Sequence, residues 1–386
     1  MKICRYFKGD RPCKYYWIDR SHNCLDPESP YYSEYSHRIL LIKLDAVGDV
    51  VRSTCIAEGL KKKYPDSQLT WLVAKEAEIF ITDNPFIDNI ITYDDENVRA
   101  LQCQKFDIII NLDKDKKATS IITLCKSNIK LGYGLNKEGY VIPLNKGTEY
   151  HYYICLDNWG AKRKNTKSYQ KMIFDMAELD YNNEAPKLYL DEDLSIKFKN
   201  TFLEKYKIGP DSNVILLNTG CGPDWPEKKW TYDGFKNLIL LLLKDDRNVV
   251  VLAGGKSEVN RNSKLFNESD ITNNFIDTTD KYSLMEFTFL INLCDIVVTA
   301  DTAALQIAVA LKRRIIAFFG LGPWKESDLF GLGKYFVREE LECIMCIGQF
   351  KLMFGTDRCP YDVLCMRLIT ADEVHLAITE LLEDIK

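Results

Sequence analysis

Residues 39–60, ILLIKLDAVGDVVRSTCIAEGL, contain a pattern that the rest of the chain repeats. The aliphatic run at 39–42 is typical of a strand buried on both faces of a parallel sheet, and Gly48 opens a segment of helical periodicity. Such a turn offers backbone N–H groups and the positive end of a helix dipole to a phosphate or carboxylate, and Gly48 lets that ligand come close. Plain packing is the alternative, because the same turn occurs in α/β proteins that bind nothing there.

Beyond residue 60, short apolar runs alternate with helical segments. We expect strands at 68–73, 90–93 and 106–112, with helices at 75–83, around 100 and from about 117. This rhythm predicts right-handed βαβ units and a parallel sheet. Asp113 follows a strand, at the edge where ligands lie in open α/β sheets, although a helix cap is an equally common role for such an Asp.

The same logic restarts at Asn213. A strand at 214–218 leads into Thr219-Gly220-Cys221-Gly222, and strands at 249–252, 275–277, 296–299 and 314–319 alternate with helices. The repetition predicts an α/β protein with two Rossmann-like domains whose parallel sheets face a cleft. We expect a Cys- and aromatic-rich segment, a first domain, a second domain and a C-terminal helix, at 1–37, 38–185, 186–370 and 371–386. The Gly- and Tyr-rich region 131–169 is expected to be a loop region.

Composition excludes several classes. The 386 residues carry 51 basic and 56 acidic side chains, a formal charge of −5, so the chain is not built to bind nucleic acid. No apolar run approaches the roughly 20 residues that cross a bilayer. No transmembrane segment is therefore expected. The N-terminal stretch MKICRYFKGD also lacks the apolar core of a signal peptide, so a cytoplasmic location is expected.

Thirteen cysteines are many for that compartment, where clustered thiols are better interpreted as metal ligands than as disulfides. The run Cys343-x2-Cys346-x12-Cys359-x5-Cys365 predicts a closed four-thiolate site for one structural iron or zinc, inside the loop 343–365. Four free thiols are the alternative.

The N-terminal segment holds three further cysteines and a histidine. Cys4, Cys13, Cys24 and His22 could also hold a metal, but their spacing is not a standard pair of C-x-x-C knuckles. Free structural thiols are favoured there.

Several motifs, in order, resemble the ADP-heptose heptosyltransferases of glycosyltransferase family 9, which have the GT-B fold. They are ILLIKLDAVGDVVRST, LLNTGCGPDWPEKKW, VVLAGGKSE, CDIVVTADTAALQIAVAL and AFFGLGP. The Cys-rich ends most resemble the bacterial autotransporter heptosyltransferases, which modify protein hydroxyls and carry a four-cysteine iron site. One motif departs from the family pattern of Asp-Thr-Gly followed by His, since Ala303 follows Thr302 and Gln306 stands near the His position.

The resemblance implies an inverting transferase that moves heptose from ADP-heptose to an acceptor hydroxyl in a single displacement, with no catalytic metal. A protein Ser/Thr acceptor is favoured, and a lipopolysaccharide core glycan is the alternative. We expect the nucleotide sugar to be bound in the second domain by Thr219, Gly220, Lys228, Glu258, Asp301 and Thr302. An ammonium and backbone N–H groups there would stabilise the departing diphosphate, although Lys228 could instead be a solvated surface lysine.

The base that accepts the acceptor's proton should come from the first domain. Asp49, in the Gly48 turn, and Asp113 both fit, and Asp49 is slightly favoured. An N-cap role is the alternative for each. A homo-oligomer is compatible with the sequence.

Two other classes remain. A nicotinamide oxidoreductase would need G-x-G-x-x-G, of which AVGDVV supplies one glycine. A non-catalytic nucleotide-sugar-binding or metal-scaffolded interaction protein could use the same cleft without turnover.

Overall fold

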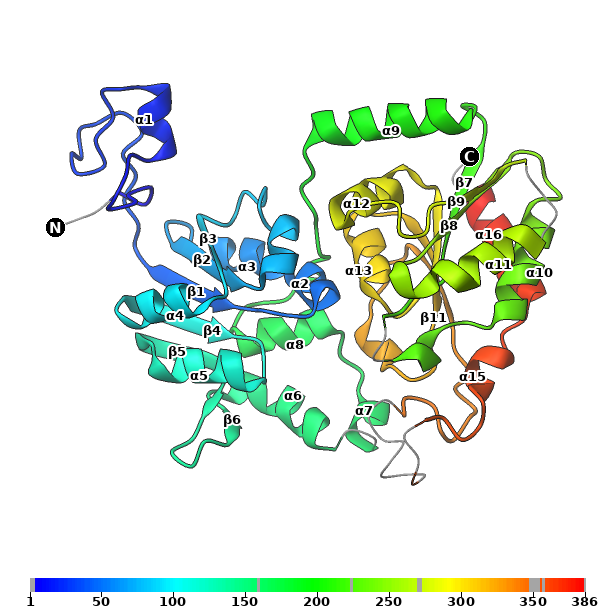
Figure 1. Ribbon diagram of the computed structural model, residues 1–386. Coiled ribbons are helices and arrows are strands. Elements are labelled where there is room, and N and C mark those ends of the chain that lie inside the picture. The colour runs from blue at the N-terminus through cyan, green and yellow to red at the C-terminus, as the bar shows by residue number, and fades with distance from the viewer. Residues whose placement is uncertain are drawn as a thin grey trace. The chain divides into compact units, whose positions relative to one another are not determined.

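The structure is a computed structural model that describes residues 4–157, 160–222, 225–268, 273–346, 355 and 358–384. The chain divides into two compact units (Figure 1), which we call the first unit, Met1–Tyr152 with Gln170–Glu184, and the second unit, Tyr153–Tyr169 with Ala185–Lys386. This division departs from the single boundary expected at residue 185. Arg163 explains part of the difference, because its guanidinium donates to the carbonyls of Leu341 and Glu342 at 3.1 and 2.6 Å and so ties its segment to the second unit.

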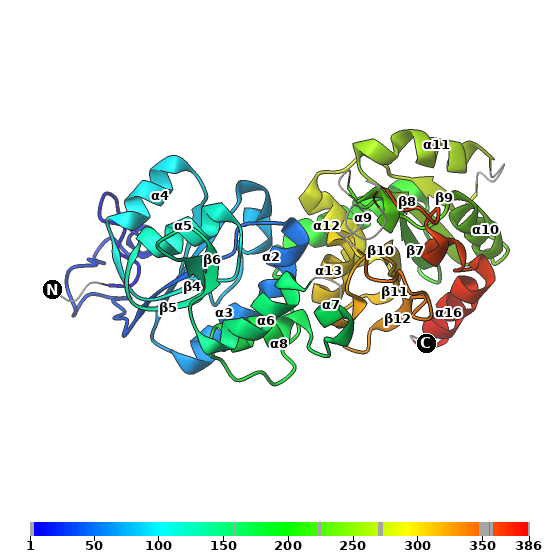
Figure 2. The same cartoon turned by 90° about the horizontal axis from the view of Figure 1, so that it is seen from below.

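The first unit is built on a six-stranded sheet of order β3-β2-β1-β4-β5-β6, parallel except for β6, which pairs antiparallel with β5. Its strands are β1 (Arg38–Ile42), β2 (Gln68–Val73), β3 (Asn89–Thr92), β4 (Lys105–Asn111), β5 (Lys126–Leu135) and β6 (Val141–Pro143). Its helices are α1 (Lys14–Ile18), α2 (Val47–Ser53), α3 (Cys55–Lys63), the 3₁₀ helix η1 (Lys75–Phe80), α4 (Asp95–Gln102), α5 (Lys116–Leu124), α6 (Lys146–Leu156) and α8 (Tyr169–Met176). Helices α4 and α5 lie on one face of the sheet, and α3, α6 and α8 lie on the other (Figure 2).

Strand β1 is buried on both faces, as its aliphatic run predicts. Leu40 and Ile42 join a core cluster with side chains of α4 and α5, while Ile39 and Leu41 are equally buried. The helical segment expected after Gly48 is divided at Thr54 into α2 and α3. The Thr54 hydroxyl donates to the Val51 carbonyl at 2.9 Å, a back-bond that bends helices.

Two further expectations were wrong. The segment expected to be helical over 75–83 is the 3₁₀ helix η1, whose buried Ala77 and Phe80 have the i, i+3 spacing that aligns in a 3₁₀ turn. The region 131–169 is not a loop region, because it contains the end of β5, β6, α6 and α7 (Gly160–Lys164). Its order comes from tertiary contacts: the Asn145 side-chain carbonyl accepts from the Gly132 N–H at 3.0 Å and from the Thr148 hydroxyl at 2.6 Å.

The second unit has a six-stranded, fully parallel sheet of order β12-β11-β10-β7-β8-β9. Its strands are β7 (Asn213–Asn218), β8 (Asn248–Ala253), β9 (Phe275–Asp277), β10 (Ile296–Ala300), β11 (Arg314–Phe318) and β12 (Gly333–Phe336). Its helices, besides α7, are α9 (Glu192–Tyr206), η2 (Pro226–Lys228), α10 (Tyr232–Leu242), η3 (Lys256–Glu258), α11 (Val259–Glu268), α12 (Leu284–Leu293), α13 (Ala303–Ala310), η4 (Trp324–Glu326), α15 (Leu364–Arg367) and α16 (Ala371–Glu383).

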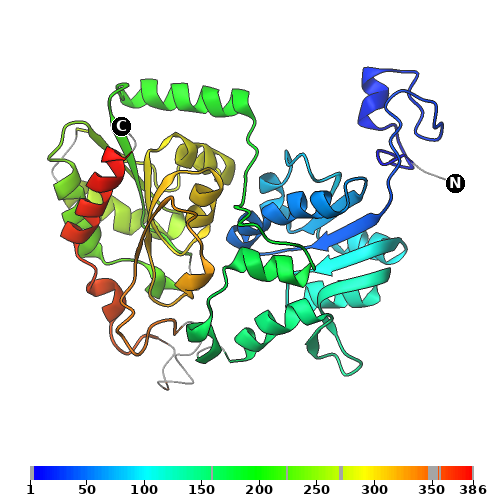
Figure 3. The same cartoon turned by 180° about the vertical axis from the view of Figure 1, so that it is seen from behind.

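The C-terminal helix α16 belongs to the core of this second unit. Val374, Ile378 and Leu381 pack with α10 and with the strands, and Figure 3 shows α16 and α10 together on one side of the sheet. The strand order reverses between β7 and β10, and ligands of open α/β sheets bind at such a switch point, beyond the carboxyl ends of the strands. Within the described residues, no helix is both long and apolar enough to span a bilayer.

Candidate functional site

A cavity of about 520 Å³ lies at this switch point, entirely within the second unit. The residues that end or follow β7, β8, β9 and β10 line it, together with the start of α12 and α13. They are Asn218, Gly220, Cys221, Gly222, Ala253, Gly254, Gly255, Ser257, Glu258, Thr278, Asp280, Tyr282, Leu284, Phe287, Thr302, Ala303 and Ala304.

One wall of the cavity is the N-terminus of α13. Thr302 occupies the N-cap position, but its side chain does not cap the helix. The Thr302 hydroxyl lies instead 3.1 Å from that of Thr299 and 3.4 Å from the side-chain amide of Asn218. Ala303 and Ala304 of the first turn line the cavity. This wall therefore suits an anion, since the first N–H groups of a helix and its dipole attract negative charge.

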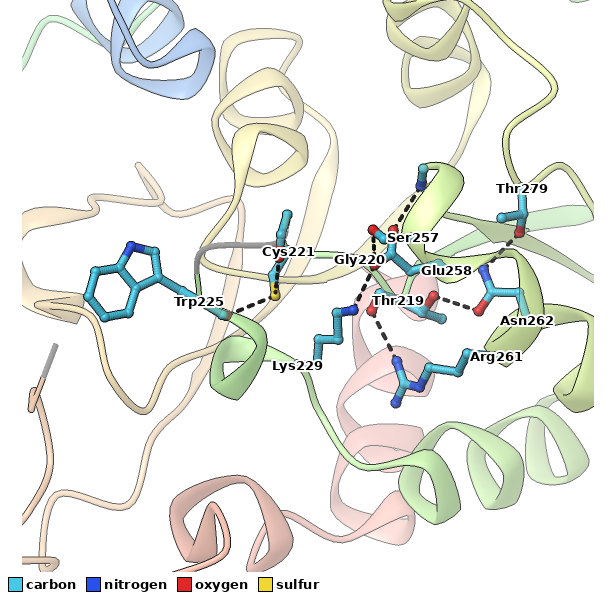
Figure 4. Close-up of polar contacts among 12 residues, drawn as sticks. Thr219, Gly220, Cys221, Trp225, Lys229, Ser257, Glu258, Arg261, Asn262 and Thr279 are labelled. Carbon is cyan, nitrogen blue, oxygen red and sulfur yellow. Dashed lines mark hydrogen bonds and ion pairs between the residues drawn. The ribbon is translucent and has the colours of Figure 1, made fainter. Parts of the chain in front are cut away.

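A buried carboxylate, Glu258, forms a second wall. Only 2% of the residue is exposed. Lys229 Nζ lies 2.7 Å from Glu258 Oε1, the Ser257 hydroxyl donates to the same oxygen, and the Gly255 N–H donates to Oε2 at 3.0 Å (Figure 4). Burial raises the pKa of Glu258, but these bonds outweigh it and the net pKa is lowered. The side chain is thus held as a carboxylate, which accepts hydrogen bonds from hydroxyl groups.

Arg261 braces the loop after β7. Its guanidinium donates to the carbonyls of Thr219 and Trp230 at 3.0 and 2.6 Å, and the Thr219 hydroxyl donates to Asn262 at 2.6 Å (Figure 4). Burial lowers the pKa of Arg261. The neighbouring Gly220 packs tightly, because a Cβ there would lie 2.8 Å from a Glu258 oxygen. The loop is therefore fixed relative to Glu258.

Lys228 and Asp301 lie beside the cavity and pair with each other. Lys228 Nζ is 2.8 Å from Asp301 Oδ2 and donates to the Asp301 carbonyl at 3.1 Å. The side chains are 16% and 21% exposed, so Lys228 is not a freely solvated lysine. Its charge lies next to Thr302, close to the wall that suits an anion.

Another part of the lining is apolar and aromatic, with Tyr282, Leu284 and Phe287. Asp280 adds a carboxylate there. A flat heteroaromatic ring fits such a surface, because its faces stack on aromatic and aliphatic side chains.

In the first unit, Asp113 is committed to a buried network. Its Oδ1 bonds the Lys43 ammonium, and its Oδ2 accepts from the Leu44 N–H at 2.6 Å. Lys43 is 2% exposed and also donates to the Asp45 carbonyl. Burial raises the pKa of Asp113, and Lys43 opposes that shift. Both oxygens of Asp113 therefore anchor the end of β1.

Asp49 differs from Asp113 in exposure. Its side chain is 41% exposed in the first turn of α2, next to Gly48, with Arg52 Nη2 at 2.8 Å and Lys43 Nζ at 3.9 Å. A cavity of about 320 Å³ lies at the same edge of the sheet and includes Val47 of α2 in its lining. Asp49 is thus the carboxylate that solvent and a ligand can reach.

The four C-terminal cysteines share one neighbourhood. Burial raises the pKa of Cys346 to about 12, with smaller contributions from Cys343, Cys365 and Cys359. Cys346 and Cys359 pack in one small cluster, and a Cβ at Gly320 would lie 2.6 Å from Cys365 Sγ. Four thiols suit zinc or iron chemically. Residues 347–354 and 356–357 of the loop expected to hold the ion lie outside the described residues.

Side chains arranged closely enough to hold a metal ion occur in the N-terminal segment. Among the residues described, the potential ligands that converge to within 4.8 Å of one another are those of Cys4, His22 and Cys24, whereas the C-terminal cysteines form no such group. The sequence placed more weight on the C-terminal four.

The structure thus brings together most of the expected donor-site residues. Gly220, Glu258 and Thr302 line the cavity, Thr219 lies beneath it, and Lys228 and Asp301 lie beside it. Sequence reasoning missed Asn218, Lys229, Arg261, Asp280 and Tyr282. Asn218 had a detectable signal, because it is a polar residue at the end of a buried strand.

Comparisons with known proteins identify the family of the chain. The model of glycosyltransferase family 9 (heptosyltransferase) matches residues 96–350, which is more than half of the chain. The lipopolysaccharide core heptosyltransferase OpsX of Haemophilus influenzae is 22% identical over 309 residues, which cover 75% of this chain and 81% of that protein.

Two solved structures show the fold. A family 9 glycosyl transferase of Veillonella parvula has a TM-score of 0.71 at 18% identity, covering 90% of this chain and 98% of that one. The iron-containing dodecameric glycosyltransferase TibC of enterotoxigenic E. coli has a TM-score of 0.57 at 12% identity, covering 92% and 78%. The chain therefore belongs to glycosyltransferase family 9, the heptosyltransferases, and is a glycosyltransferase of the GT-B fold.

Proposed function

We propose that the cavity of the second unit binds ADP-heptose and that the chain transfers the heptosyl group to an acceptor hydroxyl with inversion. The main support is the chemistry of the cavity's lining, which combines aromatic side chains, a buried carboxylate and a helix N-terminus. These match an adenine, the hydroxyls of a ribose and a diphosphate. ADP-heptose is named for E. coli heptosyltransferase II, and TibC is known in complex with ADP-D-beta-D-heptose.

In the proposed reaction the acceptor oxygen attacks the anomeric carbon while the bond from that carbon to the diphosphate oxygen breaks. ADP leaves with the electron pair of that bond. Positive charge that meets the leaving group lowers the barrier, because negative charge on the diphosphate grows in the transition state. We assign this role to the first turn of α13 and to Lys228, whose ammonium lies beside Thr302.

We assign the general base to Asp49. Its exposed carboxylate can accept the acceptor's proton, whereas both oxygens of Asp113 are already engaged by Lys43 and the Leu44 N–H. Gly48 shapes the turn that carries this carboxylate. Asp113 then acts indirectly, by holding Lys43 near the turn.

The proposed acceptor is a protein Ser/Thr hydroxyl, and the likeness of the Cys-rich ends to autotransporter heptosyltransferases supports it. A lipopolysaccharide core glycan is the second candidate, which the relationship to OpsX favours. The 320 Å³ cavity of the first unit has a charged rim with Lys75, Glu76 and Lys117, which would suit a polar acceptor of either kind. A homo-oligomer and a cytoplasmic location complete the proposal.

We also propose one structural iron or zinc at Cys343, Cys346, Cys359 and Cys365. The shared neighbourhood of these thiols supports it. A closed thiolate site leaves no open position for catalysis, so the ion would be structural. Its function would be to fix the loop 343–365 to the end of β11.

Transfer is tested with purified full-length protein, ADP-heptose carrying a labelled sugar, and two acceptors: an autotransporter passenger domain and a heptose-deficient lipopolysaccharide. We expect one acceptor to gain the mass of heptosyl residues while an equal amount of ADP appears. Failure of both acceptors and no ADP release at high donor concentration would contradict the proposal. NMR of the product's anomeric configuration tests inversion.

A further inference from the structure

The interior of the N-terminal segment, residues 4–37, consists of potential metal ligands. Cys4, Cys13 and His22 are 0%, 3% and 4% exposed, while Trp17 and Ile18 are 63% and 68% exposed. The segment therefore does not bury its largest apolar side chains. A segment this small cannot hold one conformation by burying hydrocarbon, so it needs a disulfide, a metal or a partner.

Three ligand atoms already converge. Cys4 Sγ, a His22 ring nitrogen and Cys24 Sγ lie within 4.8 Å of one another, and His22 Nε2 is 3.4 Å from Cys24 Sγ. Two thiolates bound to one zinc at about 2.3 Å in a tetrahedron lie roughly 3.8 Å apart. Cys13 is the remaining cysteine of the segment and is buried, so we take it as the fourth group, although its sulfur is not among the three ligand atoms that already lie within 4.8 Å of one another.

The histidine is oriented as metal-binding histidines are. Its Nδ1 lies 3.2 Å from the Ser29 hydroxyl, which is itself fixed by the Asn23 N–H at 2.6 Å. This leaves Nε2 directed at the thiols. In metal sites a hydrogen bond at one ring nitrogen fixes the tautomer that binds through the other.

Further contacts enclose the cluster. The Ser33 N–H lies 3.5 Å from Cys4 Sγ, in the position of a backbone donor to a thiolate. Tyr15 and Tyr31 stack with ring centroids 5.0 Å apart, and both present edges to His22 at 6.2 and 6.1 Å. This aromatic shell limits the access of water to the sulfur and imidazole ligands.

We propose that Cys4, Cys13, His22 and Cys24 bind one zinc ion. Three thiolates and an imidazole form a closed tetrahedral set, so the ion is structural. A disulfide accounts for the arrangement less well, because it would use two of the three cysteines and leave the oriented imidazole without a role.

The ion would secure the segment to the first unit at the amino ends of its strands. The backbone carbonyl of Arg5, the residue after Cys4, accepts a hydrogen bond from the Gln68 side chain at 2.6 Å. The Arg5 guanidinium lies 3.8 Å from the Asp88 carboxylate. Lys8 donates to Asn89 at 2.9 Å. Figure 1 shows the segment beyond the amino end of β1, whereas α2, whose first turn contains Asp49, follows the other end of that strand. Loss of the ion should release the segment without changing the donor cavity.

Elemental analysis of the full chain tests the proposal. The Cys4→Ser/Cys24→Ser variant should contain about one zinc equivalent less than the wild type, and Cys103→Ser, which removes an exposed thiol outside the cluster, should contain the same amount. Each variant's zinc content is compared with that of the wild type, so any metal bound at the C-terminal cysteines contributes equally to both and does not affect the difference. Equal zinc in the double variant and the wild type would overturn the proposal, as would a disulfide in the reductant-free, denatured wild type that links two of these three cysteines.

Two histidine variants guard against a general folding failure. His22→Ala should lose zinc, whereas His22→Cys, which restores a four-thiolate set, should retain it. Chelation should also speed proteolytic cleavage near residue 37 while ADP affinity stays unchanged. Zinc retained by His22→Ala, or cleavage unaffected by chelation, would contradict the assignment.

Discussion

Glu258→Gln probes the donor site most sharply, because it removes a charge from the cavity with little change of shape. A carboxylate has about four acceptor positions, and Lys229, Ser257 and Gly255 occupy three of them. Within the described residues, one position on this carboxylate is therefore left for a ligand hydroxyl. A hydrogen bond to a charged group contributes about 1.5–3 kcal/mol, so ADP should bind roughly 10- to 160-fold more weakly.

Isothermal titration calorimetry with ADP measures this effect. Glu268→Gln is the matched control, because Glu268 lies at the end of α11, exposed and paired with Lys236 at 3.1 Å, outside the cavity. The control should bind ADP as the wild type does. Unchanged affinity in folded Glu258→Gln would refute the assignment of this carboxylate to the nucleotide.

The difference in stability between the wild type and Glu258→Gln should depend on pH, because only the wild type can titrate at this position. The pKa of Glu258 is lowered in the folded state, so its charge stabilises the fold at pH values above the ordinary glutamate pKa. That contribution is lost as the pH falls through the lowered pKa. The difference in unfolding free energy between wild type and Glu258→Gln should therefore narrow below about pH 4. A gap that widens under acid would show that the bonds to Lys229 and Ser257 do not hold the carboxylate ionised.

Three other predictions concern the remaining assignments. Lys228→Ala should lower kcat about 100-fold with its melting temperature nearly kept, because a donor to the leaving group is lost, and steady-state ADP release checks this. Asp49→Asn should lower the transfer rate roughly 100-fold or more. Asp113→Asn should mainly lower stability, because it leaves the buried Lys43 without its carboxylate partner. Transfer rates and denaturant midpoints measured for both variants distinguish the two effects. Cys346→Ser should lower metal content and melting temperature while ADP affinity is kept, and calorimetry with elemental analysis would expose the opposite pattern.

The strands and the place of the second unit's cavity could largely be predicted from the sequence. Buried aliphatic runs specify parallel strands through their own composition, so the end of β7 and the start of α13 could be located, and with them Gly220 and Thr302. A residue that lies at a strand end is tied to the site by topology alone.

Partnerships formed across the fold could not be predicted. The pairing of Lys229 with Glu258 and that of Asp113 with Lys43 join residues far apart in the sequence, so neither could be predicted. The convergence of the N-terminal ligands could not be predicted for the same reason. Their irregular spacing matches no knuckle, and only folding brings Cys4 beside His22.

A crystal structure of the chain soaked with ADP-heptose tests whether the second unit binds the nucleotide. We expect nucleotide density in the 520 Å³ cavity, with the diphosphate within hydrogen-bond distance of the backbone nitrogens of Ala303 or Ala304 and a ribose hydroxyl on Glu258. Density for the nucleotide in the first unit's cavity, or an empty second-unit cavity at a donor concentration that saturates turnover, would contradict it.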